Sequence, residues 1–165
     1  NILRLSNFLS LHLRKEVYMK FADFKPGMVF KQGPYHLTKE EMLDFAQRYD
    51  PQWFHIDEER AKQDRWGGLI ASGWQTCGIA MKLAVEACLK DSESFASPGL
   101  DVVKWLKPVR PGDDLYWQGT IKATRTSNTR PGIGIMLWSW EVRNQNDDVV
   151  LELDATSLFD LTTKS

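Results

Sequence analysis

The chain of 165 residues has almost no net charge and no long apolar run. Its formal net charge is -1, so it lacks the basic excess that attracts nucleic acids or anionic membrane surfaces. A helix that spans a bilayer needs roughly 20 consecutive apolar residues. The leucines near the N-terminus are interrupted by Arg4, Ser6, Asn7 and His12. The sequence therefore predicts neither a nucleic-acid partner nor a membrane partner.

Cysteine is equally scarce. Two cysteines are present, Cys77 and Cys88, and both fall in one predicted helix. Their separation corresponds to roughly 16 Å along that helix, which is too far for a disulfide between them. Lone thiols without paired spacing form neither a zinc site nor a redox motif. We expect two reduced core cysteines and a cytoplasmic location.

The motifs of several enzyme classes are missing. Gly67-Gly68 does not belong to a G-x-x-x-x-G-K-S/T phosphate-binding loop. Ser72 is not set in a nucleophile-elbow motif, and the cysteines lie in an apolar helix, so neither a Ser-His-Asp nor a Cys-His arrangement is supported. His55 has carboxylates near it in the sequence, but one imidazole and loop carboxylates are a weak metal signal. We expect no metal site.

What the chain does contain suits one globular domain. Of its residues 42% are hydrophobic and 26% are charged, which is enough apolar material for a core. Seven tryptophans provide large flat surfaces for a core, a subunit contact or an acyl ligand. We interpret residues 1–18 as an N-terminal extension or a cloning remnant, with a targeting peptide as the less favoured alternative. Residues 19–165 are expected to form the domain.

A first helix is predicted to begin at Thr38 and to end at Asp50. Thr38 and Glu41 have the spacing of a capping box, with a hydroxyl at the N-cap and a carboxylate three residues later. Pro51 disfavours helical geometry at the residue before it. Asp50 is therefore expected at the helix end, with its side chain free.

A second, longer helix is predicted from Ser72 to about Lys90, and Ser72 to Gln75 repeats the capping-box spacing. Lys82, Glu86 and Lys90 fall on one narrow strip, and the other positions are mostly apolar. A helix that is apolar over most of its circumference is buried on most sides. We therefore expect strands to wrap around it.

Strand-like runs with alternating apolar residues account for most of the remaining chain, and the last four follow one another through short, turn-rich connections. Short connections predict antiparallel neighbours. The expected fold is α+β, with one antiparallel sheet wrapped around a long central helix and a second copy covering the exposed Trp-rich surface. Gly33-Pro34 inside the first run predicts a kink or an edge position, and the fourth run has Met136, Trp138, Trp140 and Val142 on one side. The runs are Met28–Leu37, Leu100–Val109, Leu115–Thr124, Ile133–Arg143 and Val149–Leu161.

Two pairs of residues are candidates for chemistry. Asp50 and His55 could face one water and act as general base and acid, although a turn-capping Asp and a loop His would have the same spacing. Ser72 and Gly73 open the second helix, where a free N–H could hold an enolate oxygen. The alternative is that Ser72 only caps the helix and that Gly73 only packs.

Taken together, four segments make the chain resemble the MaoC-like dehydratase family, the (R)-specific enoyl-CoA hydratases with a hot-dog fold. The resemblance extends from about Phe21 to Leu161. The segments are RYDPQWFHID (48–57), GGLIASGW (67–74), SPGLDVVKWLKPVRPGD (97–113) and VVLELDATSLF (149–159).

The resemblance implies residue roles. The family motif has the form D-x-N-P-x-H, so Asp50 and His55 match its acid–base pair, whereas Gln52 replaces Asn and Trp53 replaces Pro. Ser72 would match the serine that supports the pair or the substrate, and the Gly73 N–H the oxyanion donor.

The activity implied is addition of water across the 2,3 double bond of an enoyl-CoA, giving (R)-3-hydroxyacyl-CoA. CoA would be carried by the substrate, and no other cofactor is expected. The active unit would be a homodimer or a dimer of dimers. One alternative is a hot-dog acyl-CoA thioesterase with Glu86 as its carboxylate. Another, suggested by Gln52 and Trp53, is a non-catalytic acyl-CoA-binding module.

Overall fold

A computed structural model describes residues 18–162 of the chain. The expected N-terminal extension therefore lies outside the described residues, except for Tyr18. The helical segments are η1 (Phe21–Asp23), α1 (Lys39–Tyr49), α2 (Trp53–Ile56), α3 (Glu58–Gln63), α4 (Gly73–Ala84) and η2 (Val85–Leu89). The strands are β1 (Val29–His36), β2 (Ser94–Ala96), β3 (Leu100–Trp105), β4 (Asp114–Thr126), β5 (Ile133–Arg143) and β6 (Val149–Asp160).

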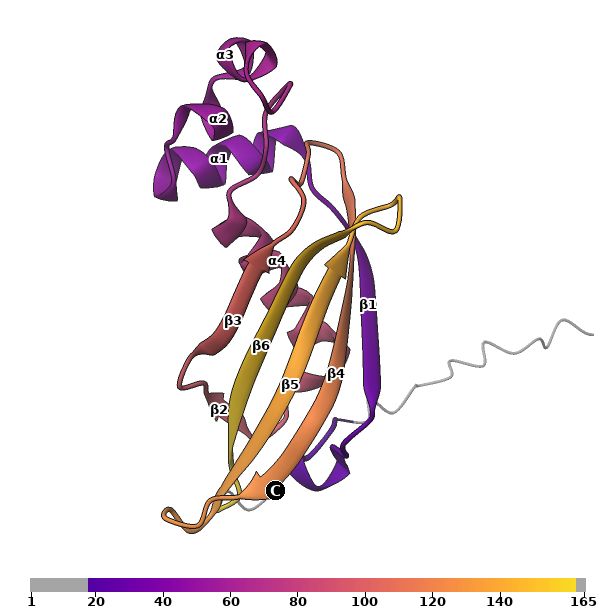
Figure 1. The fold of residues 1–165 in the computed structure, drawn as a ribbon. Helices are drawn as coiled ribbons and strands as arrows, with labels where there is room; N and C mark the ends of the chain where they lie inside the picture. The colour runs from indigo at the N-terminus through magenta and orange to yellow at the C-terminus, as the bar shows by residue number, and fades with distance from the viewer. Residues whose placement is uncertain (1–17, 163–165) are drawn as a thin grey trace, which may run out of the picture.

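The strands form one antiparallel sheet of order β1-β4-β5-β6-β2, with β3 also paired to β6. The sheet curves along α4, and helices α1, α2 and α3 lie beyond one end of it (Figure 1). This arrangement confirms the expected α+β fold with a central helix. None of the helices within residues 18–162 is both long and apolar enough to cross a membrane.

The edges of the sheet differ most from the expected strands. β1 is an edge strand whose register shifts between Gln32 and Tyr35, at the cis Gly33–Pro34 peptide, as the Gly-Pro pair inside the run predicts. β3 ends at Trp105 rather than Val109. The Leu106 N–H still donates to the Val150 carbonyl at 2.9 Å, and Pro108 has no N–H with which the ladder could continue to Val109. β2 was not predicted, since three residues are too few to display alternation.

The central helix has the predicted extent, but it is not α-helical throughout. After α4 the chain continues in a π-helical turn, η2, in which Lys90 N–H donates to the Val85 carbonyl. Cys77 lies in α4 and is half-buried, whereas Cys88 lies in η2 and is buried, and both are free thiols. Ala80 and Ala84 are fully buried, so these small side chains let the strands approach α4 closely.

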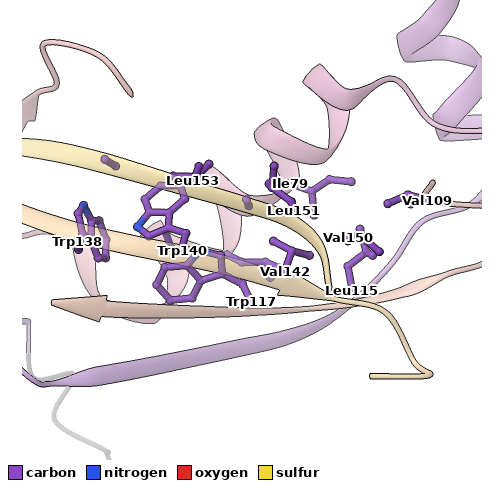
Figure 2. Close-up of a cluster of buried hydrophobic side chains, with 14 of the residues drawn as sticks. Ile79, Val109, Leu115, Trp117, Trp138, Trp140, Val142, Val150, Leu151 and Leu153 are labelled. Atoms are coloured by element: carbon purple, nitrogen blue, oxygen red, sulfur yellow. The ribbon is translucent and has the colours of Figure 1, made fainter. Parts of the chain in front are cut away.

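The core lies between α4 and the concave face of the sheet. Trp117, Trp138 and Trp140 meet edge to face, with ring centroids 4.9 to 5.9 Å apart (Figure 2). The Trp138 indole donates to the Ser157 hydroxyl at 3.2 Å. The predicted apolar face of residues 136–142 is thus confirmed as core.

Candidate active site

The end of α1 places the first candidate residue. Asp50 is the C-cap of α1, and its N–H donates to the Ala46 carbonyl at 2.9 Å. Asp50 is no longer helical, with φ -150° and ψ 66°, because Pro51 disfavours the helical conformation there. The expected helix end is confirmed. The Asp50 side chain therefore projects from a residue outside the helix.

His55 lies on α2, a four-residue helix that was not predicted from the sequence. The imidazole is 4% exposed. Its Nε2 lies 3.1 Å from Oδ2 of Asp50, and its Nδ1 lies 2.7 Å from the Ile70 carbonyl oxygen. The structure therefore brings Asp50 and His55 together, and His55 is not an exposed loop residue.

Ser72 contacts the same carboxylate. Its hydroxyl is fully buried and donates to Oδ2 of Asp50 at 2.7 Å. The predicted capping box at this position is wrong, because Ser72 makes no side-chain cap bond and the Gln75 amide donates to the Glu41 carbonyl instead. Ser72 thus lies behind Asp50 and supports it, and it does not line the adjoining cavity.

Gln52 is a third neighbour of the carboxylate. Its Nε2 donates to Oδ1 of Asp50 at 2.8 Å. Burial pushes the pKa of Asp50 upward, but hydrogen bonds from Ser72 and Gln52 and the nearby His55 outweigh it, so the pKa lies below its ordinary value. In the sequence, Gln52 is distinguished only as a departure from the family motif. Its position two residues after Asp50 was the available signal.

The two ring nitrogens of His55 have different partners. Both ring nitrogens of His55 face oxygen acceptors, from Ile70 and from Asp50. The Ile70 carbonyl oxygen can only accept, so Nδ1 carries a proton, and the other contact is a hydrogen bond when one proton lies between Nε2 and Oδ2 of Asp50. The contact between Nε2 of His55 and Oδ2 of Asp50 is therefore one across which a proton can pass between the two residues.

Gly73 is the first residue of α4, and Trp105 lies directly against it. A Cβ atom added at Gly73 would lie 2.4 Å from the Trp105 ring. The Trp105 indole donates to the Gly73 carbonyl at 2.9 Å. Within residues 18–162 the Gly73 N–H has no acceptor, as is usual in the first turn of a helix.

These groups meet at a cavity of about 340 Å³. Asp50, His55 and Gly73 line it, together with the polar residues Gln52, Thr76 and Lys107. Its other walls are mostly aromatic or apolar, and they come from Phe54, Trp66, Ile70, Trp74, Trp105, Leu106, Val109 and Val150. A few polar groups in a cavity with mostly apolar walls suit a largely apolar substrate with a reactive polar group.

Two other candidates do not join this site. Trp53 does not line the cavity, and its ring instead lies under the Arg60 guanidinium, 4.3 Å from the ring centroid. Glu86 lies at the far end of the central helix and pairs with Lys82 at 2.5 Å. Within residues 18–162 no three His, Cys, Asp or Glu side chains are grouped as a metal ion would require.

Comparison with known proteins gives consistent relatives. Residues 21–132 match the model of the MaoC-like domain. The chain is 33% identical over 134 residues to the uncharacterised protein YdeM of Bacillus subtilis, an alignment that covers 81% of this chain and 94% of that protein.

Solved structures agree. The MaoC-like dehydratase from Rhodospirillum rubrum is 32% identical with a TM-score of 0.79, covering 87% of this chain and 97% of that one. The R-hydratase PhaJ1 from Pseudomonas aeruginosa has a TM-score of 0.65 at 17% identity, covering 84% of each chain, and it supports the fold alone.

Proposed function

Because the chain belongs to the MaoC-like domain family, we propose that it is a hydro-lyase that adds water reversibly to the 2,3 double bond of an enoyl thioester. One observation carries this proposal. Asp50 and His55, two groups able to exchange protons, line a mostly apolar cavity together with Gly73, whose N–H has no acceptor within residues 18–162.

The proton transfers balance within the Asp50–His55 pair. Asp50 takes a proton from a water molecule as the water oxygen forms a bond to C3 of the substrate. His55 gives its Nε2 proton to C2, and the proton on Asp50 then passes to His55. The pair ends with the same number of protons as it began, and neither a metal nor a redox cofactor enters these steps.

Gly73 and Ser72 serve the same step in this proposal. When water attacks C3, negative charge develops on the thioester oxygen, and the Gly73 N–H at the positive end of α4 would stabilise it. Ser72 holds the carboxylate in place from behind. CoA would be the thiol part of the substrate, and (R)-stereochemistry at C3 is carried over as an expectation from the family.

The direct test is a turnover screen with trans-2-enoyl-CoA thioesters of short, medium and branched acyl chains. We expect loss of the enoyl absorbance, with (R)-3-hydroxyacyl-CoA as the product and no release of free thiol. Absence of hydration with every thioester would contradict the proposal.

Thiol release without hydration would instead indicate a thioesterase. The position of Glu86 disfavours it, since this carboxylate pairs with Lys82 and does not line the cavity that holds Asp50. Saturable binding of a CoA thioester without turnover would indicate the non-catalytic binding module.

We also propose that the working unit is a homodimer. Large apolar side chains are exposed on α4, β2 and β3 and just after β3, with Trp74 62% exposed: Trp74, Met81, Phe95, Leu100, Trp105 and Leu106. β3 is paired to β6 along one edge only, so its other edge has free backbone groups within the described chain. Trp74, Trp105 and Leu106 also line the cavity, so a second copy bound here would cover its opening.

Replacing Leu100 by Arg is expected to convert a dimer into a monomer, because a charge would be buried where two β3 edges meet. Sedimentation velocity at micromolar concentration checks the mass. The matched control is Leu137→Arg on the outer face of β5, which exposes a similar fraction of its side chain and lies away from β3. A monomeric wild-type protein would contradict the dimer.

A further inference from the structure

Arg110 makes an unusual set of contacts for a surface-accessible cation. Its guanidinium donates to three backbone carbonyls of one loop: those of Trp66, Gly68 at 3.1 Å and Leu69 at 3.3 Å. Within residues 18–162 no carboxylate lies within ion-pair distance of this guanidinium. Arg110 is therefore bound to loop backbone and not to an acidic side chain.

The loop has the conformation that this contact needs. Gly67 has φ +65° and Gly68 has φ +151°, values that L-residues with side chains adopt rarely. In this conformation the carbonyls of Trp66, Gly68 and Leu69 all accept from the one guanidinium. Glycines at positions 67 and 68 thus have a structural role, although they form no phosphate loop.

Arg110 itself is held from the other side. Its backbone N–H donates to Oδ2 of Asp113 at 2.8 Å, and the Gln145 amide donates to Oδ1 of the same residue at 2.9 Å. Asp113 is buried. The backbone of Arg110 is therefore held in place by Asp113 while its guanidinium bonds the loop.

The loop continues directly into the residue that holds His55. The Ile70 N–H donates to the Phe54 carbonyl at 3.2 Å, and the Ile70 carbonyl accepts from Nδ1 of His55 at 2.7 Å. The next residue, Ala71, donates to the Val109 carbonyl at 2.8 Å. A displacement of the loop would thus move the acceptor that sets the orientation of the imidazole.

We propose that Arg110 is a positioning residue for His55. It clamps the carbonyls of residues 66–69 so that the Ile70 carbonyl holds Nδ1 of His55 and directs Nε2 to Asp50. Arg110 neither lines the cavity nor touches the pair, so it acts through the loop. The consequence for activity rests on the proposed function, whereas the consequence for His55 does not.

The variants are Arg110→Met, which removes the clamp, and Arg110→Lys, which keeps the charge but cannot reach three carbonyls at once. The matched control is Arg125→Met. Arg125 is exposed, and its guanidinium donates to the neighbouring Thr126 carbonyl at 3.5 Å. If Arg110→Met does not fold, Arg110→Lys alone decides the test.

The first readout needs no substrate. In protein labelled with 15N at its three histidines, His55 is expected to give a slowly exchanging imidazole N–H resonance, assigned by its loss in His55→Gln. We expect this resonance to shift and to exchange faster in both Arg110 variants, and to be unchanged in Arg125→Met. An unchanged His55 resonance in a folded Arg110 variant would overturn the proposal.

The second readout is kinetic. We expect Arg110→Met to lower kcat by about 10-fold to 10²-fold with a smaller change in KM, because misplacing a catalytic group slows chemistry more than binding. Gly68→Ala is expected to give a similar loss, and the double variant little more, since both disturb one loop. A wild-type protein without hydratase activity would refute the proposed function and leave the resonance test of Arg110 intact.

Discussion

Replacing Asp50 by Asn is expected to lower kcat for hydration of an enoyl-CoA by about 10²-fold to 10⁴-fold, the usual contribution of general acid–base catalysis. Asn has nearly the same shape and can still accept a hydrogen bond from Ser72. It cannot take a proton from water, and its amide cannot accept both from Ser72 and from Gln52 on separate oxygens. The measurement is loss of crotonyl-CoA absorbance.

A matched control lies in the same segment. Asp57 is exposed and caps α3 through its carboxylate, and Asn is an equally good N-cap, so Asp57→Asn is expected to keep full activity. Equal rates for Asp50→Asn and wild type would remove Asp50 from the mechanism.

The pH dependence of stability follows from the same carboxylate. The pKa of Asp50 is lowered in the folded protein, so the unfolded chain binds its proton first as pH falls. The stability that Asp50 contributes is fully present above the unfolded pKa of about 3.9 and is lost as pH falls through the folded pKa. Urea denaturation should therefore find wild type more stable than Asp50→Asn near pH 7, with the difference shrinking in acid.

Replacing Gly73 by Ala is expected to lower kcat/KM by about 10²-fold, because the active site has no space for the added methyl group. The new Cβ would lie 2.4 Å from the Trp105 ring, so the indole must leave the Gly73 carbonyl and change the cavity wall. Overpacking of this kind also destabilises a protein by about 1–3 kcal/mol. The measurements are steady-state kinetics and urea denaturation.

Gly78 provides the matched control on the same helix. A Cβ added there meets nothing within 4 Å, so Gly78→Ala should keep activity and raise stability by up to about 1 kcal/mol. If the clash causes the loss at Gly73, then Trp105→Ala should destabilise the Gly73→Ala protein less than it destabilises wild type. Equal behaviour of Gly73→Ala and Gly78→Ala would contradict the account of this site.

Several features could be read from neighbouring residues. Pro51 ended α1 at Asp50, and the alternation of Met136, Trp138, Trp140 and Val142 identified the core face of β5. These features depend on contacts between residues close in sequence or on a repeated pattern, so they can be predicted from the sequence alone. The pairing of Asp50 with His55 was predicted from the resemblance to the family motif.

Other features were hidden because nothing local distinguishes them. Capping-box spacing was present at both Ser72 and Thr38, yet Thr38 caps its helix and Ser72 bonds Asp50. The choice depends on whether a carboxylate is brought next to the hydroxyl, which the sequence around Ser72 cannot tell. α2 is hidden for a similar reason, since four residues display no helical period.

By itself, the sequence determined the α+β class, the central helix, the core faces of the long strands and the candidates Asp50, His55, Ser72 and Gly73. Only the tertiary structure decided what these candidates touch, including Gln52 on Asp50, Trp105 on Gly73 and the Ile70 carbonyl on His55. The physical reason is distance along the chain. Ser72 and Asp50 are 22 residues apart, and Arg110 reaches a carbonyl 42 residues away, so packing of the whole sheet against α4 selects these partners.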